Sequence, residues 1–141
     1  PPQIMLMEFL PIEAVVSLLT DFLKDHEADP DRVYLTGASM GGRGVYEMLY
    51  DHATLFAAAA PLCAFGIPTL APRLKEVPIR IYHGERDDVV PLAYGCARAD
   101  ALRSAGCDVR FSVLPHAGHG IEQEVYAHDD LWEWFLTHRR R

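Results

Sequence analysis

Residues 31–47 read DRVYLTGASMGGRGVYE, and they combine the signals of a strand, a sharp turn and a helix. Residues 33–36 are apolar, aromatic or β-branched, and they run directly into a glycine-rich stretch. Beyond the glycines, residues 45–49 place apolar side chains at helical spacing. Ser39 stands at the apex of the turn, inside a G-x-S-x-G pattern formed with Gly37 and Gly41.

This arrangement suits a nucleophilic serine. A serine on a strained strand-to-helix turn points its hydroxyl out of the sheet. We expect glycine at positions 37 and 41 because a side chain there would collide with the neighbouring backbone. The backbone N–H of Met40, at the helix N-terminus, is placed to donate to an oxyanion. An ordinary glycine-rich strand–helix turn would give the same pattern, so later motifs have to decide.

The composition limits the classes of protein to which this chain can belong. The chain has 141 residues, of which 50% are hydrophobic and 23% are charged, as expected for one globular domain. No run of 18 apolar residues occurs, so we expect no membrane insertion. The net charge of −7 argues against nucleic acid and anionic membrane surfaces as partners. The composition indicates a soluble protein, either cytoplasmic or secreted, and we expect no cofactor.

Predicted helices and strands alternate along the chain. Three- and four-residue apolar spacing predicts a helix from Ile12 to about His26, and Pro91 opens another that ends at Gly106. A final helix is expected from about Glu122 to His138, anchored by Trp132, Phe135 and Leu136, with Trp134 partly exposed or packed on a neighbour. The predicted strands, besides the one before Ser39, are residues 55–62, 79–83 and 109–114. This order predicts an α/β fold, a mostly parallel sheet with helices on both faces.

Three cysteines, Cys63, Cys96 and Cys107, lack metal-ligand spacing. If Cys96 and Cys107 bracket a helix, about ten residues of rise separate them by roughly 15 Å. A disulfide needs Cα atoms within roughly 7 Å, so we expect three free thiols. Cys63 ends a strand on the side of the expected site, although a small buried residue is its simpler interpretation.

Three strand ends carry a serine, an acid and a histidine: Ser39, Asp87 and His119. Open α/β sheets place their sites at the carboxyl ends of strands. These residue types are the parts of nucleophilic acyl transfer, in which serine attacks, histidine moves the proton and a carboxylate orients the imidazole. The chain order serine, acid, histidine is that of α/β-hydrolases.

Each assignment has a competitor. Asp88 adjoins Asp87, and we expect it to cap the helix that starts near Pro91. His116 competes with His119 for the role of the base, and His83 is expected to pack and hydrogen-bond near the site rather than react. His116 and His119 with an aspartate lack convergent ligand spacing, so no metal site is predicted.

The motifs TGASMGGRGVYEML, IYHGERDDVVP and LPHAGHG resemble the nucleophile elbow, acid loop and histidine loop of α/β-hydrolase esterases. The resemblance is strongest to the polyhydroxybutyrate-depolymerase-like and phospholipase/carboxylesterase-like branch. That branch is itself similar to predicted prolyl-oligopeptidase-type peptidases. It covers nearly the whole chain from about Ile12. It implies Ser39 as nucleophile, Asp87 as acid, His119 as base and Met40 as an oxyanion donor. The family's H-G-x-x-D pattern selects Asp87 over Asp88, and its G-H pattern selects His119, which leaves His116 as a loop residue. The dienelactone-hydrolase branch would have cysteine at position 39.

The front of the chain departs from this family. About 30 residues precede the elbow strand, whereas the family normally has three or four strands there, with a loop that supplies the second oxyanion donor. We therefore expect residues 1–141 to form a single partial α/β-hydrolase domain without the N-terminal strands. Its elbow strand would be an open sheet edge, which favours self-association.

Three functions remain open on this basis. The leading hypothesis is a serine hydrolase that cleaves small-molecule carboxylic esters through an acyl-enzyme. A prolyl-oligopeptidase-like serine peptidase and a truncated, non-catalytic hydrolase-like module are the alternatives.

Overall fold

The described part of the chain is organised around one parallel sheet. The structure, a computed structural model, describes residues 11–140. Its four strands are hydrogen-bonded in the order β1-β2-β3-β4, and all neighbouring pairs are parallel. The strands are β1 (Tyr34–Ala38), β2 (Ala58–Leu62), β3 (Ile79–Gly84) and β4 (Val109–Leu114). Parallel neighbours need a crossover, and helical segments supply each one.

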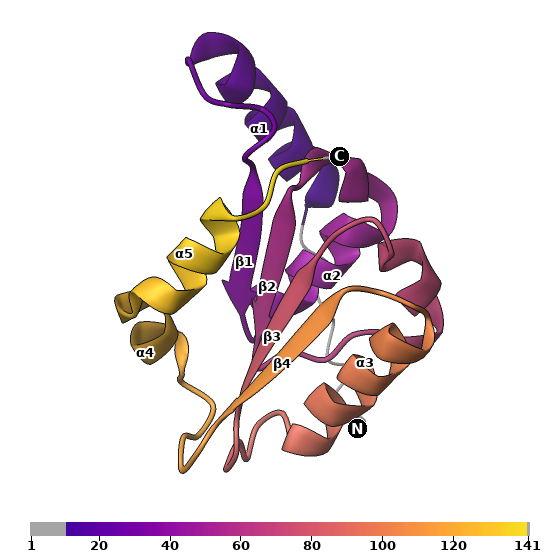
Figure 1. The fold of residues 1–141 in the computed structure, drawn as a ribbon, viewed down its shortest axis with the longest axis vertical. Helices are drawn as coiled ribbons and strands as arrows, with labels where there is room; N and C mark the ends of the chain where they lie inside the picture. The colour runs from indigo at the N-terminus through magenta and orange to yellow at the C-terminus, as the bar shows by residue number, and fades with distance from the viewer. Residues whose placement is uncertain (1–10, 141) are drawn as a thin grey trace, which may run out of the picture.

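Helices cover both faces of this sheet (Figure 1). The crossovers α2 and α3 pack on one face, and α4 and α5 pack on the other. The α-helices are α1 (Ile12–Asp25), α2 (Met40–His52), α3 (Leu92–Ser104), α4 (Glu122–Ala127) and α5 (Asp129–Leu136). Two 3₁₀ segments, Ala53–Leu55 and Pro68–Leu74, complete the connections. The predicted fold class is confirmed.

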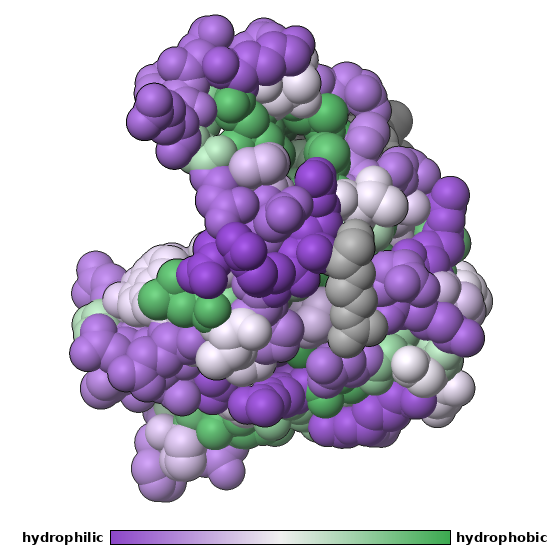
Figure 2. Space-filling view, turned by 45° about the horizontal axis from the view of Figure 1, so that its top comes forward, coloured by the Kyte–Doolittle hydropathy of each residue, from purple (hydrophilic) through white to green (hydrophobic). Residues whose placement is uncertain are grey.

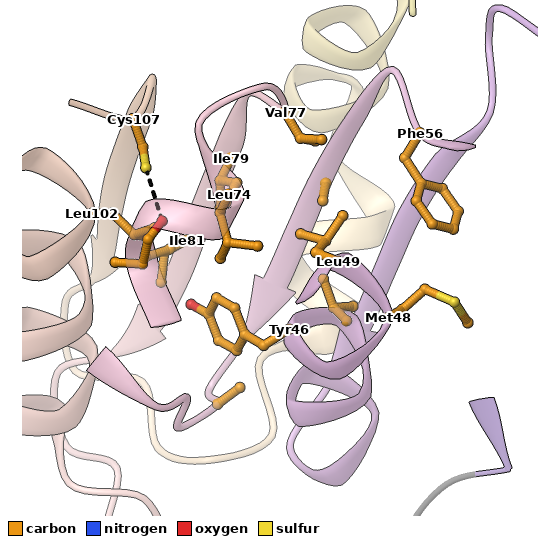
Figure 3. Packing of buried hydrophobic residues seen from close by; sticks show 14 of the residues in the cluster. Tyr46, Met48, Leu49, Phe56, Leu74, Val77, Ile79, Ile81, Leu102 and Cys107 are labelled. Carbon is orange, nitrogen blue, oxygen red and sulfur yellow. Dashed lines mark hydrogen bonds between the residues drawn. The ribbon is translucent and has the colours of Figure 1, made fainter. Parts of the chain in front are cut away.

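The larger core lies between the sheet and α2 and α3. Figure 3 shows Tyr46 and Leu49 projecting from α2 into this layer, with Leu74 and Ile81 on its other side. Strand β2, which runs AAAPL, is completely buried. Its alanines leave room for α2 to lie close to the sheet. The strand predicted over residues 55–62 is therefore shorter, because Leu55 belongs to a 3₁₀ turn.

Helix α1 was predicted correctly but buries little of its apolar face. Ile12, Val16 and Leu19 pack against the larger core, whereas Leu18 is 71% exposed and Phe22 is 50% exposed. In Figure 2 the outer side of the helical segment at the top of the view is hydrophilic, and hydrophobic residues show on the side turned toward the body of the molecule. Among the described residues, β1 and β4 form the edges of the sheet. Self-association through the β1 edge stays a prediction.

The C-terminal segment corrects two predictions. One helix was expected from Glu122 to His138, but His128 is extended, with φ −92° and ψ 139°, and separates α4 from α5. Trp134 is buried at 7% exposure, whereas Trp132 and Leu136, expected as anchors, are 42% and 58% exposed. The break rotates α5 relative to a continuous helix, so a different side of the helix faces the sheet. Phe135 is buried as predicted.

Within residues 11–140, no helix combines the length and apolar character needed to cross a lipid bilayer. Residues 5–9 form too short a segment to classify from the sequence, and they lie outside the described residues; Pro11 directly precedes α1.

Substitution of the two tryptophans tests the position of α5. Trp134→Ala removes a buried ring and should lower the free energy of unfolding by about 3–5 kcal/mol. Trp132→Ala, at the more exposed position, should cost far less, although it also removes the hydrogen bond that Nε1 donates to the Tyr126 carbonyl. Urea denaturation of both variants measures the difference. Equal losses would contradict the observed orientation of the helix.

Candidate active site

Ser39 sits on a strained turn between a strand and a helix. β1 ends at Ala38 and α2 begins at Met40, so Ser39 alone makes the reversal. Its backbone has φ 54° and ψ −116°, a conformation that is costly for a residue with a side chain. Two backbone hydrogen bonds hold it there. The Ser39 N–H donates to the Leu62 carbonyl at 2.9 Å, and the Arg43 N–H donates to the Ser39 carbonyl at 3.0 Å.

Of the two glycines expected to prevent a collision with the backbone, Gly37 has that role and Gly41 does not. A Cβ at Gly37 would lie 2.6 Å from the backbone of Gly41, so glycine is needed at position 37 as expected. A Cβ at Gly41 would meet nothing within 4 Å, which corrects the expectation of a collision there. The second close approach is at Gly42, where a Cβ would lie 2.6 Å from the Ala64 Cβ and 2.9 Å from the Leu62 carbonyl oxygen.

Ser39, His119 and Asp87 lie in one chain of hydrogen bonds. His119 Nδ1 is 2.8 Å from Asp87 Oδ2 and 3.0 Å from Oδ1, and His119 Nε2 is 2.8 Å from Ser39 Oγ. A carboxylate can only accept, so Nδ1 carries the proton and Nε2 is left to accept from the serine hydroxyl. The structure thus brings together three side chains that are 80 and 32 positions apart in sequence. Their catalytic roles stay a prediction.

Asp87 is held as an ionised acid. Its side chain is fully buried, and its Oδ1 accepts hydrogen bonds from the N–H groups of Val89 at 3.0 Å and Val90 at 2.8 Å. Burial acts to raise the pKa of the carboxyl, but hydrogen bonds from His119 and the backbone outweigh it, so the pKa lies below its ordinary value. Asp88 is exposed, and α3 starts without any side-chain cap, so the predicted capping role of Asp88 was wrong.

The acid loop and the histidine loop interlock. The Glu85 N–H donates to the Leu114 carbonyl at 3.0 Å, and the Arg86 N–H donates to the Ala117 carbonyl at 2.8 Å. Gly84 permits this contact, because a Cβ there would lie 2.0 Å from the Gly118 carbonyl oxygen. Backbone contacts between the two loops therefore bring His119 and Asp87 within reach of each other.

His116 lies apart from the hydrogen-bonded chain. Its side chain is 74% exposed, its N–H donates to the Glu85 carboxylate at 3.0 Å, and its Nδ1 lies 3.9 Å from that carboxylate. It is a loop residue, as predicted.

Met40 provides the first N–H of α2. The first N–H groups of a helix have no intrahelical acceptor, and the helix dipole adds partial positive charge at this end. The Arg43 N–H is the one that reaches back to the Ser39 carbonyl. The N–H of Met40 directly follows the serine at this helix end, and its role as an oxyanion donor stays a prediction.

A buried group behind Asp87 was not predicted as a unit. Ligand atoms of Cys63, His83 and Asp87 lie within 4.8 Å of one another, a spacing that could hold a metal ion. However, His83 Nε2 is 2.7 Å from the Val90 carbonyl oxygen, which can only accept, so this nitrogen carries a proton and not a free lone pair. Burial also raises the pKa of the Cys63 thiol to about 12, which opposes a thiolate ligand. The group is therefore better suited to hydrogen bonding than to metal coordination.

The sequence did contain a signal for this group. Cys63 follows β2, and His83 and Asp87 lie at the end of β3, which is the neighbouring strand. The ends of parallel neighbours meet at one edge of the sheet. All three cysteines are free thiols, as predicted, and only Cys96 is exposed.

Solved structures share this fold. A thermostable esterase superposes with a TM-score of 0.86 at 31% identity, covering 92% of this chain and 37% of the esterase. An acylaminoacyl peptidase from Pyrococcus horikoshii gives a TM-score of 0.80 at 17% identity, covering 92% of this chain and 28% of the peptidase. The parallel sheet and its serine elbow are those of an α/β-hydrolase.

The chain belongs to the prolyl oligopeptidase family, whose model matches residues 66–140, a little more than half of it. The match contains Asp87 and His119, and Ser39 lies before it. Acyl-protein thioesterase 1 from Neurospora crassa is 32% identical over 117 residues, covering 77% of this chain and 46% of the thioesterase. A bifunctional acetylxylan esterase/xylanase from Neocallimastix patriciarum is 34% identical over 76 residues, covering 54% of this chain and 11% of that protein. The chain thus spans less than half the length of these two relatives.

The lowered pKa of Asp87 predicts a pH-dependent contribution to stability. Above about pH 4, the ordinary range of an aspartate, the ionised carboxylate stabilises the folded state, and this contribution is lost as the pH falls through the lowered folded-state pKa. Asp87→Asn should therefore lower the free energy of unfolding at pH 7, and its deficit relative to wild type should shrink at pH 3. Urea denaturation across this range measures both.

The neighbouring Asp88→Asn is the matched control. Because Asp88 is exposed, this variant should stay close to wild type throughout the range. A deficit of Asp87→Asn that does not change with pH would contradict the account of the buried carboxylate.

Proposed function

We propose that this chain carries the reacting groups of a serine hydrolase that cleaves carboxylic esters through an acyl-enzyme intermediate. The observation that carries the proposal is the hydrogen-bonded chain from Ser39 Oγ through His119 to Asp87. A serine hydroxyl is a weak nucleophile unless an adjacent base removes its proton. Here His119 Nε2 lies at hydrogen-bonding distance from that hydroxyl, and Asp87 fixes the tautomer that leaves Nε2 free to accept.

In the acylation step, Ser39 Oγ forms a bond to the ester carbonyl carbon while its proton passes to His119 Nε2. The carbonyl oxygen becomes an oxyanion, and Asp87 stabilises the imidazolium. When the carbon–oxygen bond to the leaving group breaks, the alcohol departs with the proton from Nε2. The acyl group remains on Ser39 as an ester.

Deacylation repeats the sequence with water. His119 Nε2 takes a proton from a water molecule as its oxygen attacks the acyl carbon, and it returns this proton to Ser39 Oγ as the bond to the serine breaks. The products are a carboxylic acid and the regenerated hydroxyl. In both steps the N–H of Met40 donates to the oxyanion, and loss of one such donor typically costs about 10²–10³ in turnover.

The relatives support ester-type substrates. The thermostable esterase, the acyl-protein thioesterase and the acetylxylan esterase are each named for hydrolysis of an oxygen ester or a thioester. The family's own name points instead to peptide bonds, and this keeps a serine peptidase as the alternative. Esters have better leaving groups than amides. The two functions can therefore be distinguished by comparing the rates at which the protein hydrolyses esters and peptide amides.

A fluorophosphonate probe tests the nucleophile. The full-length protein should be labelled covalently, and Ser39→Ala should abolish labelling because the phosphonylated oxygen is removed. Ser104→Ala, which changes an exposed serine at the end of α3, is the matched control and should be labelled as fast as wild type. Labelling that persists in Ser39→Ala would refute Ser39 as the nucleophile. An unlabelled wild type would favour the non-catalytic alternative.

Parallel assays on p-nitrophenyl esters and peptide p-nitroanilides distinguish esterase from peptidase. We expect kcat/KM to be larger for the esters by well over tenfold. A thioester substrate of the same acyl chain should also be cleaved, since the acylation chemistry is shared. Comparable or greater kcat/KM on the peptide amides would assign the site to a peptidase.

A further inference from the structure

Besides His119, buried polar side chains that take no direct part in the proposed hydrolysis lie close to the Asp87 carboxylate. His119 approaches the carboxylate from one side, and the N–H groups of the following loop approach Oδ1. His83 and Cys63, both 0% exposed, lie against the same carboxylate. Neither residue is hydrogen-bonded to Ser39 or His119.

His83 closes the acid loop. Its Nε2–H donates to the Val90 carbonyl at 2.7 Å and lies 3.4 Å from Asp87 Oδ2. The Val90 N–H, in turn, donates to Asp87 Oδ1 at 2.8 Å. Val90 is thus held through its N–H by the carboxylate and through its C=O by the imidazole. This double attachment fixes the loop that presents Asp87 to His119.

A histidine that donates to the Val90 carbonyl through Nε2 leaves its other ring nitrogen, Nδ1, unpaired among the described residues. Nδ1 is buried without a hydrogen-bond partner within the described part of the chain. It lies against Gly95, where a Cβ would come within 2.6 Å of it. A buried acceptor without a hydrogen-bond partner destabilises the folded state. An apolar ring would fill the same space without this cost, so packing alone does not account for a histidine here.

Cys63 adds a second donor. It directly follows β2 with a left-handed backbone, φ 44°, and its Sγ lies within 4.8 Å of a carboxylate oxygen of Asp87. Hydrogen bonding by the thiol contributes to the lowered pKa of Asp87. Burial keeps the sulfur protonated, so it adds a weak donor and no competing negative charge.

We propose that His83, assisted by Cys63, is a positioning residue that holds the Asp87 carboxylate in the orientation required by His119. The proposal rests on the proposed serine hydrolase function. It places the effect of His83 on the chemical step, since His83 acts through Asp87 and does not touch the substrate.

Two amide substitutions at position 83 separate positioning from packing. Glutamine places its amide nitrogen near the position of Nε2 and can still donate to the Val90 carbonyl. Asparagine reaches only the position of Nδ1, which has no partner. We expect His83→Asn to lose about 10²-fold in kcat with KM unchanged, as for a small misplacement of a catalytic group. His83→Gln should stay within about tenfold of wild type.

Ile81→Val is the packing control, because it alters a buried side chain on the same face of the same strand. It should lower stability with kcat retained. At Cys63, alanine should lower kcat more than serine does, since serine keeps a donor. These smaller substitutions also provide a test if the His83 variants do not fold.

A spectroscopic measurement keeps this test independent of activity. The His119 Nδ1–H bonded to Asp87 should give a far-downfield proton resonance, assigned by its absence in Asp87→Ala. We expect His83→Gln to retain this resonance and His83→Asn to shift or broaden it. If wild type neither hydrolyses esters nor reacts with fluorophosphonate, the proposed function fails, and the resonance still tests the positioning role.

Two results would overturn the proposal. One is an equal kcat for His83→Gln, His83→Asn and Ile81→Val together with an unchanged resonance. The other is an effect confined to KM, because a residue that acts through Asp87 should alter the reaction and not the binding of substrate.

Discussion

The contact between Asp87 and His119 is the interaction on which the candidate site depends. It joins two loops from neighbouring strands, and these loops are held together by backbone hydrogen bonds and by a close approach that needs glycine at position 84. The parallel sheet brings the strand ends to one edge, but it does not by itself set distances of 2.8 Å. The loop contacts provide that precision. The imidazole is thereby held with one nitrogen on the acid and the other on the serine.

The electrostatics of the site follow from the same contacts. A buried carboxylate is costly unless it is fully hydrogen-bonded. Asp87 meets this condition with donors from the backbone, from His119 and from the group behind it, so it stays charged where burial alone would favour the neutral form. A charged acid is what an imidazolium needs during acyl transfer. Burial disfavours the ionised form of the carboxylate. It also lowers the local dielectric, which strengthens the attraction between the ionised carboxylate and the imidazolium.

Much of the fold could be predicted from the sequence because its signals are local. Apolar spacing predicted α1 to within a residue, and the run of strand-forming residues before Ser39 predicted β1 and its turn. The order of serine, acid and histidine placed the three candidate residues on strand ends, and the structure brings them together. The resemblance to the family's H-G-x-x-D pattern selected Asp87 over Asp88, and burial now separates the two.

What could not be predicted depends on contacts between distant segments. The collision that excludes a side chain at position 42 involves Leu62 and Ala64, which belong to the next strand and its loop. The orientation of α5 depends on an extended residue, His128, in a stretch whose apolar spacing suits one continuous helix. The arrangement of Cys63 and His83 around Asp87 requires the register of β2 against β3. Periodicity carries no information about any of these.

The backbone of Ser39 has a consequence for how this chain can change. Its conformation is one that glycine adopts freely and that costs any other residue about 1–3 kcal/mol. Thermal stability by itself would therefore favour losing the side chain at the apex of the turn. A side chain at position 39 therefore destabilises the folded state, and the reactivity of the serine hydroxyl is a physical reason to keep it. In a lineage released from the need for chemistry, this would be among the first positions expected to drift.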